Sequence, residues 1–385
     1  MTELAGVELD NWDRLTASLE LPLAIEDITP AFLSAALSHR FPGTVVNDFR
    51  IAFTRHGFTT ILRLDLDLDG KSKGAGVPSR IILKGGFEPA TRGRAKDFAI
   101  APFLMEVAAY REMKPALGLH MPDCYFAEVD VERRQMILLM EDLALRNVRF
   151  CNGLVPHTAA QVRRRLTSLA AFHARSWGDP ELKKSDGRWK MFPGNGAGMF
   201  FDYMHHVGYA EKSEWQKYVD MPRGAASSAE FHDVDWVLHS LKYMDALSKA
   251  LPNCVVHGDT HAGNMFEEPD GTPGFFDSLP SRAAPMIEIA YYITNVMDCA
   301  ERRRNDKALI AHYRDELSRH GVTVPSLDEM LRQFAAFLPY GYVTFMVNEN
   351  TYQTESFNTA HTARYSAAML DHDTKKVIEE GFIPL

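Results

Sequence analysis

The chain has 385 residues, more than a single compact core usually contains, so we expect two domains or lobes. Hydrophobic residues make up 46% of the chain and charged residues 24%, a composition that is ordinary for a globular protein and excludes general disorder. The net charge of −9 argues against a nucleic-acid-binding protein, because such proteins normally carry a basic surface.

The cysteine content and the hydropathy pattern predict a cytoplasmic protein. None of the four cysteines lies in a CxxC pair, so we expect free thiols rather than a zinc site or a disulfide framework. Residues 1–15 are polar and acidic and do not resemble a secretory signal. No stretch approaches the roughly 18 apolar residues that a membrane span requires. The sequence does not indicate an oligomeric state.

The first 140 residues predict a β-sheet with one clear internal helix. Thr29-Pro30 suits a helix N-cap followed by proline, and the apolar residues after it recur at helical spacing. A polar, glycine-rich connector is expected at 70–78 and an amphipathic helix over 99–113. Apolar patterns typical of strands occupy residues 48–54, 59–68, 80–84, 123–131 and 135–140.

After residue 142 the pattern becomes mainly helical. Helices are expected over 157–177 and 233–251, and over most of the chain from about 287 onward. Residues 178–225 are rich in glycine, proline, tryptophan and lysine, which predicts loops with short helices. Two short apolar runs, at 254–256 and 274–276, predict strands.

These elements predict an α+β fold with two lobes. Residues 1–142 would form a small N-lobe, in which a helical N-terminal extension precedes an antiparallel sheet with one helix. Residues 143–385 would form a larger, mainly helical C-lobe that includes an insert at about 178–250.

The polar segment with the clearest chemistry runs through residues 257–264 and is followed by a second carboxylate. Asn264 comes five residues after Asp259, and Asp277 comes thirteen residues after Asn264. Mg²⁺ prefers hard oxygen ligands, takes few of them from protein and the remainder from phosphate and water. Because the flanking strands would bring these side chains to one place, the pattern indicates phosphoryl transfer at a magnesium site.

This segment resembles the aminoglycoside phosphotransferase and choline kinase superfamily, whose signature is His-Gly-Asp, an Asn five residues after the Asp, an apolar strand and a further Asp. Among members of this superfamily, the sequence most resembles ecdysteroid kinase-like proteins and kinase-like domains joined to acyl-CoA dehydrogenases. The resemblance implies a protein-kinase-like fold. It also implies that Asp259 is the catalytic base, that Asn264 and Asp277 bind Mg²⁺, and that His257 is structural.

The resemblance extends into the N-terminal half of the chain. It implies that Lys84, at a strand end, contacts the phosphates and that Glu106, on the next helix, pairs with Lys84. It places Gly57 in the loop that covers the phosphates. It also implies a hinge whose backbone meets the adenine, formed by Met140, Glu141 and Leu143.

The activity implied by the resemblance is transfer of the γ-phosphate of ATP, or alternatively GTP, to a hydroxyl of a small molecule. The acceptor is not readable from the sequence. The chain departs from the family pattern at Ser278, where an aromatic residue is common, at Glu288, where relatives usually have Asp, and in a phosphate-covering loop with a single glycine. His173 is interpreted as a packed core histidine.

Two other interpretations of the same residues stay open. A pseudokinase would bind nucleotide without transferring phosphate. A metal-dependent hydrolase would use His257, Asp259 and His261 to hold a transition metal that activates water. The hydrolase interpretation leaves Asn264 and Lys84 without roles, and it predicts a stoichiometric transition metal and activity without ATP.

Overall fold

The computed structural model describes residues 3–4, 7–8, 17–88, 96–194 and 196–381, so most of the N-terminal segment 1–15 lies outside the described residues. The chain divides into two compact units. We call them the sheet unit, Met1–Ala116 with His120–Val148, and the helical unit, Leu117–Leu119 with Arg149–Leu385.

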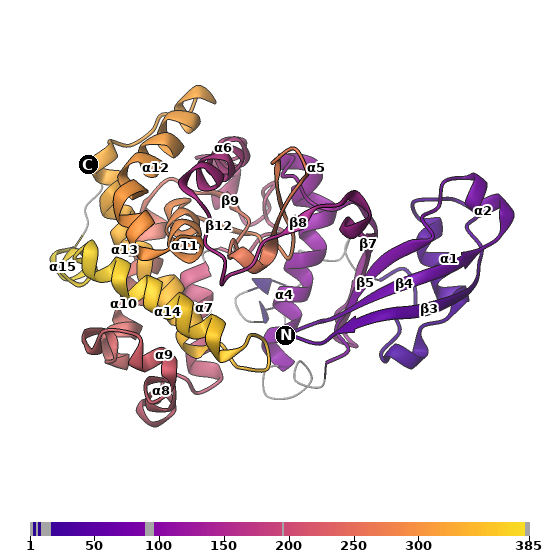
Figure 1. The fold of residues 1–385 in the computed structure, drawn as a ribbon, viewed down its shortest axis with the longest axis horizontal. Helices are drawn as coiled ribbons and strands as arrows, with labels where there is room; N and C mark the ends of the chain where they lie inside the picture. Colours follow the sequence, from indigo (N-terminus) through magenta and orange to yellow (C-terminus); the bar gives the residue numbers. More distant parts are fainter. Residues whose placement is uncertain (1–2, 5–6, 9–16, 89–95, 195, 382–385) are drawn as a thin grey trace. The chain divides into compact units, whose positions relative to one another are not determined.

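The sheet unit is built on a five-stranded antiparallel sheet with the strand order β3-β4-β5-β7-β6 (Figure 1). Its strands are β3 (Val46–Arg55), β4 (Thr60–Leu68), β5 (Arg80–Gly85), β6 (Cys124–Asp130) and β7 (Gln135–Glu141). A separate antiparallel pair joins β1 (Glu3–Leu4) to β2 (Val7–Glu8). All five strand patterns that the sequence predicts in this part of the chain are therefore present.

The same part of the chain also forms several helices. They are α1 (Pro30–Ser38), α2 (Gly70–Gly74), α4 (Lys96–Ala108) and α5 (Lys114–Leu117), with a π-helical turn at Ala109–Met113 and short 3-10 helices at Ile25–Asp27 and Leu143–Arg146. The connector predicted at 70–78 thus contains a short helix. Asp69 caps it by accepting a hydrogen bond from the Ser72 amide at 2.7 Å.

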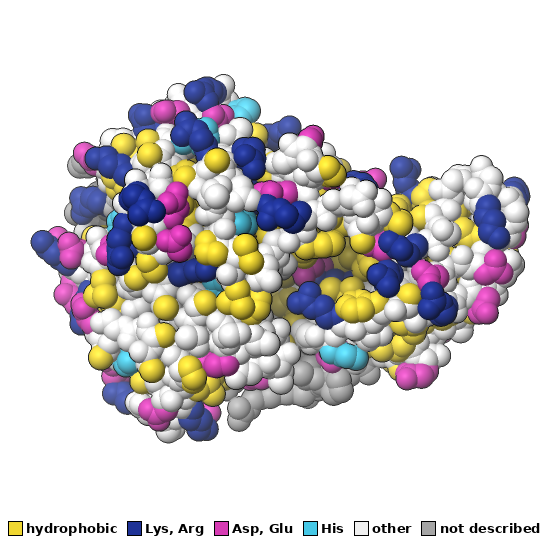
Figure 2. All heavy atoms as spheres, viewed as in Figure 1, with side chains coloured by type: hydrophobic (Ala, Val, Ile, Leu, Met, Phe, Trp, Pro, Cys, Tyr) yellow, Lys and Arg dark blue, Asp and Glu magenta, His cyan; other side chains and the backbone are white. Residues whose placement is uncertain are grey.

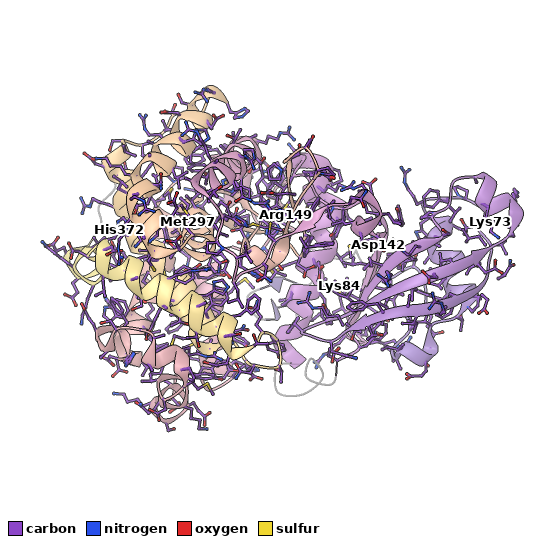
Figure 3. The ribbon with its side chains drawn as sticks, viewed as in Figure 1. Lys73, Lys84, Asp142, Arg149, Met297 and His372 are labelled. Atoms are coloured by element: carbon purple, nitrogen blue, oxygen red, sulfur yellow. The ribbon has the colours of Figure 1, made fainter. Side chains whose placement is uncertain are left out.

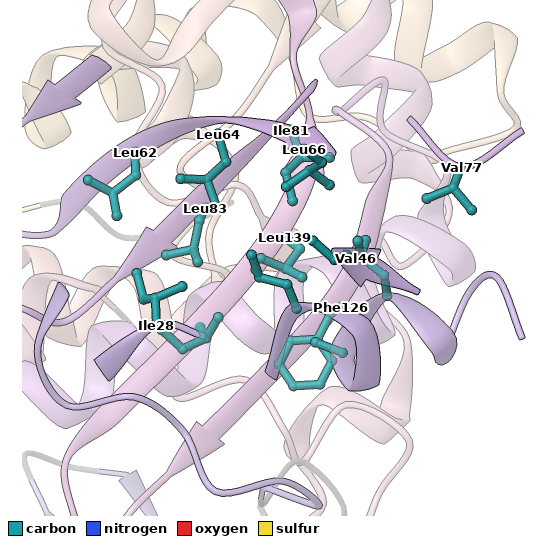
Figure 4. Close-up of a cluster of buried hydrophobic side chains, with 14 of the residues drawn as sticks. Ile28, Val46, Leu62, Leu64, Leu66, Val77, Ile81, Leu83, Phe126 and Leu139 are labelled. Atoms are coloured by element: carbon teal, nitrogen blue, oxygen red, sulfur yellow. The ribbon is translucent and has the colours of Figure 1, made fainter. Parts of the chain in front are cut away.

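The core of the sheet unit follows from the alternation along β4. Side chains at alternate positions of a strand point to the same face, and the leucines of β4 are buried on one face while the residues between them stay partly exposed. Helix α1, which Thr29 caps through the Phe32 amide as predicted, contributes its own buried residues to this cluster. Figure 4 shows the leucines with neighbours from other strands.

The helical unit contains most of the helices of the chain. They are α6 (Ala159–Ala174), α7 (Gly196–His206), α8 (Lys212–Val219), α9 (Pro222–Ala225), α10 (Val234–Ala250), α11 (Met286–Val296), α12 (Cys299–Arg319), α13 (Leu327–Val347), α14 (Glu355–Asp371) and α15 (Thr374–Glu380). Short 3-10 helices occur at Pro180–Lys183, Ala229–Phe231 and Ala262–Asn264.

Two small sheets complete the helical unit. The first has the order β11-β10-β8, with β8 (Arg149–Phe150), β10 (Met265–Glu267) and β11 (Pro273–Phe275), and the second pairs β9 (Cys254–Val256) with β12 (Ser281–Ala283). The sequence patterns predict β9 and β11 but do not indicate β10 or β12. The strands β9 to β12 all have three residues, but β10 ends in Glu267 and β12 contains Ser281 and Arg282, so neither is a continuous apolar run.

Residues 178–225 are more helical than their composition indicates. Helix α7 has eleven residues and begins at Gly196, and α8 follows within six residues of its end. Trp215 on α8 is buried, and its indole N–H donates to the His232 carbonyl at 2.7 Å. Packing of such large side chains outweighs the low helix propensity of the glycines.

Helix α11 lies in the interior of the helical unit, because every one of its residues is buried. It packs against α13, α14 and α6.

Of the described helices, none has the length and apolar character needed to cross a bilayer. All four cysteines are free thiols. Figure 2 shows basic and acidic side chains interspersed over the visible face of the helical unit.

Shortening a leucine in the sheet core tests this description of the sheet unit. Leu83 on β5 is fully buried, so Leu83→Ala is expected to lower the free energy of unfolding by about 3–5 kcal/mol, through lost burial and the cavity left behind. Ile51 on the edge strand β3 is 37% exposed, and Ile51→Ala is expected to cost less than about 1 kcal/mol. Urea unfolding measures both, and equal losses would contradict the assigned core.

Candidate active site

Two loops of the helical unit, at 257–264 and 276–279, are tied together by hydrogen bonds. The amide of Leu279 donates to the carbonyl of His257 at 2.9 Å, and the Ser278 hydroxyl donates to the same carbonyl at 2.8 Å. At the other end, the Phe276 amide donates to the Asn264 carbonyl at 3.0 Å. The strands before these loops belong to different sheets, but the loops themselves meet.

Asp259 is held by two neutral donors. Its Oδ2 accepts from Asn264 Nδ2 at 2.8 Å, and its Oδ1 accepts from the Tyr291 hydroxyl at 3.1 Å. Burial, with the Asp259 charge beside it, raises the pKa of Tyr291 well above its usual value, so the hydroxyl stays protonated and donates. The Asp259 side chain remains 27% exposed, which leaves its oxygens accessible to a ligand.

The oxygens of Asn264 and Asp277 suit a hard divalent cation. Because Asn264 Nδ2 donates to Asp259, the side-chain oxygen of Asn264 is directed elsewhere, and among the described residues no group donates to it. Asp277 adopts a φ of 53°, a left-handed conformation that is uncommon outside glycine and often marks functional positions. One amide oxygen and one carboxylate match Mg²⁺, which takes most of its ligands from water and phosphate.

The sharp turn at Gly258 requires glycine. Its φ of +88° is unfavourable for other residues, and a Cβ at this position would lie 1.9 Å from the carbonyl oxygen of Leu279. The His-Gly-Asp pattern therefore has a steric reason, because the close approach of the two loops leaves no room for a side chain between His257 and Asp259.

Helix α11 supports the loop at 257–264 through three side chains on one face. Glu288, Tyr291 and Asn295 follow the spacing i, i+3, i+7, which places them on the same side of a helix. The two Glu288 oxygens accept from the amides of His257 at 3.2 Å and Gly258 at 2.9 Å. Tyr291 donates to Asp259, and the Asn295 side-chain oxygen accepts from the Ala262 amide at 3.0 Å.

Glu288 itself is fixed by a second histidine. His173 on α6 places its Nε2 2.7 Å from a Glu288 oxygen, and its Nδ1 lies 2.7 Å from the Tyr313 hydroxyl. Burial alone would raise the pKa of Glu288, but the hydrogen bonds with His173 and with the Gly258 amide hold it below its usual value. His173 is thus the packed core histidine that the sequence predicts, with the added role of orienting Glu288.

The histidines of the hydrolase interpretation are engaged in the loop. Burial lowers the pKa of His257, which is therefore neutral; its Nδ1 accepts from the Asp259 amide at 3.3 Å and its Nε2 donates to the Phe276 carbonyl at 3.1 Å. His261 accepts from the Gly263 amide at 3.0 Å. Among the described residues no group of three or more His, Cys, Asp or Glu is arranged to hold a metal ion. Both ring nitrogens of His257 are thus committed to hydrogen bonds within the site.

The sheet unit contains the other site residues that the sequence predicts. Lys84 on β5, which is labelled in Figure 3, and Glu106 on α4 are both 4% exposed. The Lys84 Nζ lies 2.6 Å from the Glu106 Oε1. Such a buried pair fixes the direction of the ammonium group. Gly57 lies between β3 and β4 at a negative φ, where a Cβ would meet only the Thr59 carbonyl at 3.6 Å.

The three hinge residues lie at and after the end of β7. The backbone of Met140 is paired with Ile82 on one side and Cys124 on the other, and the Glu141 amide donates to the Asp123 carbonyl at 2.9 Å. Leu143 begins the 3-10 helix after the strand and is buried. The backbone of Met140 is thus occupied by the sheet.

The supporting role of α11 is the feature that sequence reasoning missed. Glu288 is noted in the sequence only as a departure from the family pattern, and Tyr291 and Asn295 are not singled out. The available signal was a set of polar side chains at helical spacing within an otherwise apolar helix, 286–296. A polar stripe on a fully buried helix must bond to something inside the fold.

Comparison with known proteins agrees with this architecture. A family described as the ecdysteroid kinase-like family matches residues 56–324. The structure of a choline kinase from Cryptosporidium parvum Iowa II is similar with a TM-score of 0.51 and 12% identity, over 92% of this chain and 98% of that one. A Plasmodium vivax ethanolamine kinase gives a TM-score of 0.49 and 12% identity, over 83% of this chain and 81% of that one. No curated protein sequence matches the chain.

The choline kinase likeness establishes the fold, since it spans nearly all of both chains. The predicted fold class, a kinase-like α+β fold with an antiparallel sheet in the first part and helices in the second, is confirmed. At 12% identity the likeness concerns the fold alone.

Removing the charge of Glu288 tests whether this carboxylate holds the loop. In Glu288→Gln one accepting oxygen becomes an NH₂ group, which is a donor. One of the buried donors that Glu288 now satisfies, a loop amide or His173, would then face another donor. We expect the free energy of unfolding to fall by about 2–4 kcal/mol at neutral pH. The exposed Glu379→Gln is the matched control, with a change expected within about 0.5 kcal/mol.

The same variant has a pH signature. Because the pKa of Glu288 is lowered in the folded protein, its stabilising effect is present above its unfolded value near 4.5 and is lost as the pH falls through the lower folded value. The difference between wild type and Glu288→Gln should therefore shrink in acid. A difference that stays constant down to pH 3 in urea unfolding would show that the charge of Glu288 does not stabilise the fold.

Proposed function

Because the chain belongs to the ecdysteroid kinase-like family, we propose that it is an active kinase that transfers the γ-phosphate of ATP to a hydroxyl of a small molecule. The observation that carries the proposal is the state of Asp259. Two neutral donors, Asn264 and Tyr291, orient its carboxylate, and the side chain remains partly exposed. A general base needs this combination of fixed direction and access.

Asp259 is proposed to accept the proton of the acceptor hydroxyl. As the hydroxyl oxygen bonds to the γ-phosphorus, the bond to the leaving nucleoside diphosphate breaks and the proton passes to the carboxylate. Each carboxylate oxygen has two lone pairs, so the bonds from Asn264 and Tyr291 leave room for the acceptor. The acceleration would come chiefly from positioning and charge stabilisation.

Asn264 and Asp277 are proposed to hold Mg²⁺ through their side-chain oxygens. When bound, the ion neutralises charge on the phosphates. The hydrogen bond from the Phe276 amide to the Asn264 carbonyl supports this assignment, because it ties the two ligand-bearing segments together. The left-handed φ of Asp277 gives its carboxylate a direction that an extended residue would not have.

The sheet unit is proposed to bind the nucleotide. Lys84 would contact the phosphates, and the buried Glu106 carboxylate keeps the ammonium group in one direction. Gly57 would lie in the loop that covers the phosphates. The adenine would meet the chain around Met140, Glu141 and Leu143; because the Met140 backbone is paired on both sides, the contact is expected after it. The nucleotide is proposed to be ATP, with GTP as the alternative.

The acceptor is proposed to have an apolar surface next to its hydroxyl. Aromatic side chains continue outward from Tyr291, whose hydroxyl bonds Asp259. The ring of Tyr291 lies 5.6 Å from that of Tyr340, which lies 5.9 Å from Phe200, which in turn stacks on Tyr203 at 5.9 Å. Phe200 and Tyr203 are only partly buried and so can contact a ligand.

Replacing the proposed base should separate binding from transfer. Asp259→Asn keeps the size of the side chain but removes its basicity, so ATP binding should persist while transfer falls by at least about 100-fold. A screen of hydroxylated metabolites with ATP and Mg²⁺ measures transfer, and thermal stabilisation by ATP measures binding. The exposed Asp328→Asn is the control and should match the wild type.

Two outcomes of this experiment decide between the remaining interpretations. Turnover near the wild-type level in Asp259→Asn would show that another group is the base. A wild-type protein that binds ATP with Mg²⁺ but transfers phosphate to no acceptor, water included, would be a pseudokinase.

Replacing the second carboxylate should affect the ion rather than the base. Asp277→Asn is preferred to alanine because asparagine tolerates the left-handed φ, so that the backbone is kept and only the charge is lost. We expect stabilisation by ATP to lose its dependence on Mg²⁺, as measured by thermal unfolding over a Mg²⁺ titration. An unchanged Mg²⁺ dependence would remove Asp277 from the metal site.

A further inference from the structure

Helix α14 lies outside the part of the chain that matches the family, since that match ends at residue 324 and α14 spans Glu355–Asp371. Nevertheless α14 packs against α11, the helix that supports the loop with Asp259 and Asn264 (Figure 1). The side chains at this contact are polar and buried, which is costly unless they are hydrogen-bonded. Their bonds lead to the loop.

The path from α14 to the loop has two steps. The side-chain oxygen of Asn295 accepts from the Ala262 amide at 3.0 Å, and its Nδ2 donates to His361 Nδ1 on α14 at 3.2 Å. One turn further along α14, Arg364 donates to the backbone carbonyl of Asn295. Asn295 and His361 are at most 1% exposed, so water does not compete for these bonds.

The Ala262 N–H requires the Asn295 oxygen to face it, and a neutral His361 matches this orientation of the amide. Burial, and then the charge of Arg364, lower the pKa of His361 well below its usual value. A neutral ring can present Nδ1 as an acceptor, which matches the orientation with the Asn295 NH₂ toward His361. The oxygen of Asn295 then faces the Ala262 amide; the flipped amide would place two donors against each other.

His361 is itself held rigidly. Its ring lies 4.4 Å from that of Phe345 on α13, and a Cβ on Gly153 would come within 2.5 Å of its Nε2. Arg364 donates to the Gly153 carbonyl at 2.9 Å, which closes the cluster. The ring therefore has no space to turn away from Asn295.

We propose that α14 helps to position the catalytic centre. His361 acts through Asn295 to hold the short helix Ala262–Asn264 and so fixes the position of the metal-binding oxygen of Asn264. Both are positioning residues. This inference rests on the proposed function, because it takes Asn264 as a magnesium ligand. The contact differs from the support by Glu288, which fixes the opposite end of the same loop.

Amide hydrogen exchange and a Mg²⁺ titration test the proposal on the full chain. Asn295→Ala should increase exchange in a peptide covering residues 257–264, and it should raise the Mg²⁺ concentration that half-saturates stabilisation by ATP about tenfold. Asn358→Ala is the matched control. Asn358 is also fully buried and hydrogen-bonded, but its partners lie in the turn before α14, so its loss should lower the melting temperature without either change.

A pair of variants at His361 separates positioning from packing. His361→Ala removes the acceptor and should show both effects. His361→Asn puts a side-chain oxygen near the position of Nδ1 and should recover much of the exchange protection and the Mg²⁺ affinity. This pair also keeps the test decisive if Asn295→Ala fails to fold.

The outcomes are distinguishable from failure of the proposed function. If Asn295→Ala and His361→Ala behave like Asn358→Ala in exchange and in Mg²⁺ dependence, the proposal is overturned while the kinase assignment stands. If wild-type stabilisation by ATP does not depend on Mg²⁺, the proposed function fails and the role toward Asn264 fails with it. Amide hydrogen exchange measured without nucleotide still shows whether Asn295 holds the loop.

Discussion

One buried carboxylate carries much of the organisation of the helical unit. Glu288 accepts from two consecutive backbone amides of the loop at 257–264 and from His173, all in the protein interior. Taking a charge out of water costs several kcal/mol, and this cost is offset only because the carboxylate is surrounded by donors. Without the carboxylate, those donors would be buried and unsatisfied. The loop at 257–264 therefore has one arrangement in which the Glu288 carboxylate and its buried donors are all hydrogen-bonded.

The same helix extends this control along the whole loop. Tyr291 holds the side chain of Asp259 and Asn295 holds the amide of Ala262, so one rigid element sets the proposed base and the proposed metal ligand together. Gly258 permits the close approach of the loop at 276–279, which contains Asp277. A reaction that depends on positioning more than on covalent chemistry requires this kind of support beneath its reacting groups. The arrangement is consistent with a kinase.

Local patterns predict a large part of this fold. The leucines of β4 alternate at strand spacing, Thr29 caps a helix with proline after it, and the segment from His257 to Asn264 carries a recognisable order of polar groups. Each of these signals lies within a few residues of chain. The sequence could not show that Glu288 reaches back to His257, because that contact spans 31 residues and depends on how α11 packs.

Composition misled where packing decides the structure. The glycines at 196–198 and 70–74 indicate loops, yet helices form there: Asp69 caps α2, and α7 buries Ala197 and Met204. The roles of Lys84, Glu106 and the hinge residues stay predictions, since they depend on a bound nucleotide.

The most direct test is a crystal structure with Mg²⁺ and a non-hydrolysable ATP analogue. The account predicts an ion bound by the side-chain oxygens of Asn264 and Asp277 at about 2.0–2.1 Å, with the bonds from α11 to the loop unchanged. An ion held by other residues, or a loop released from Glu288 when the nucleotide binds, would contradict it.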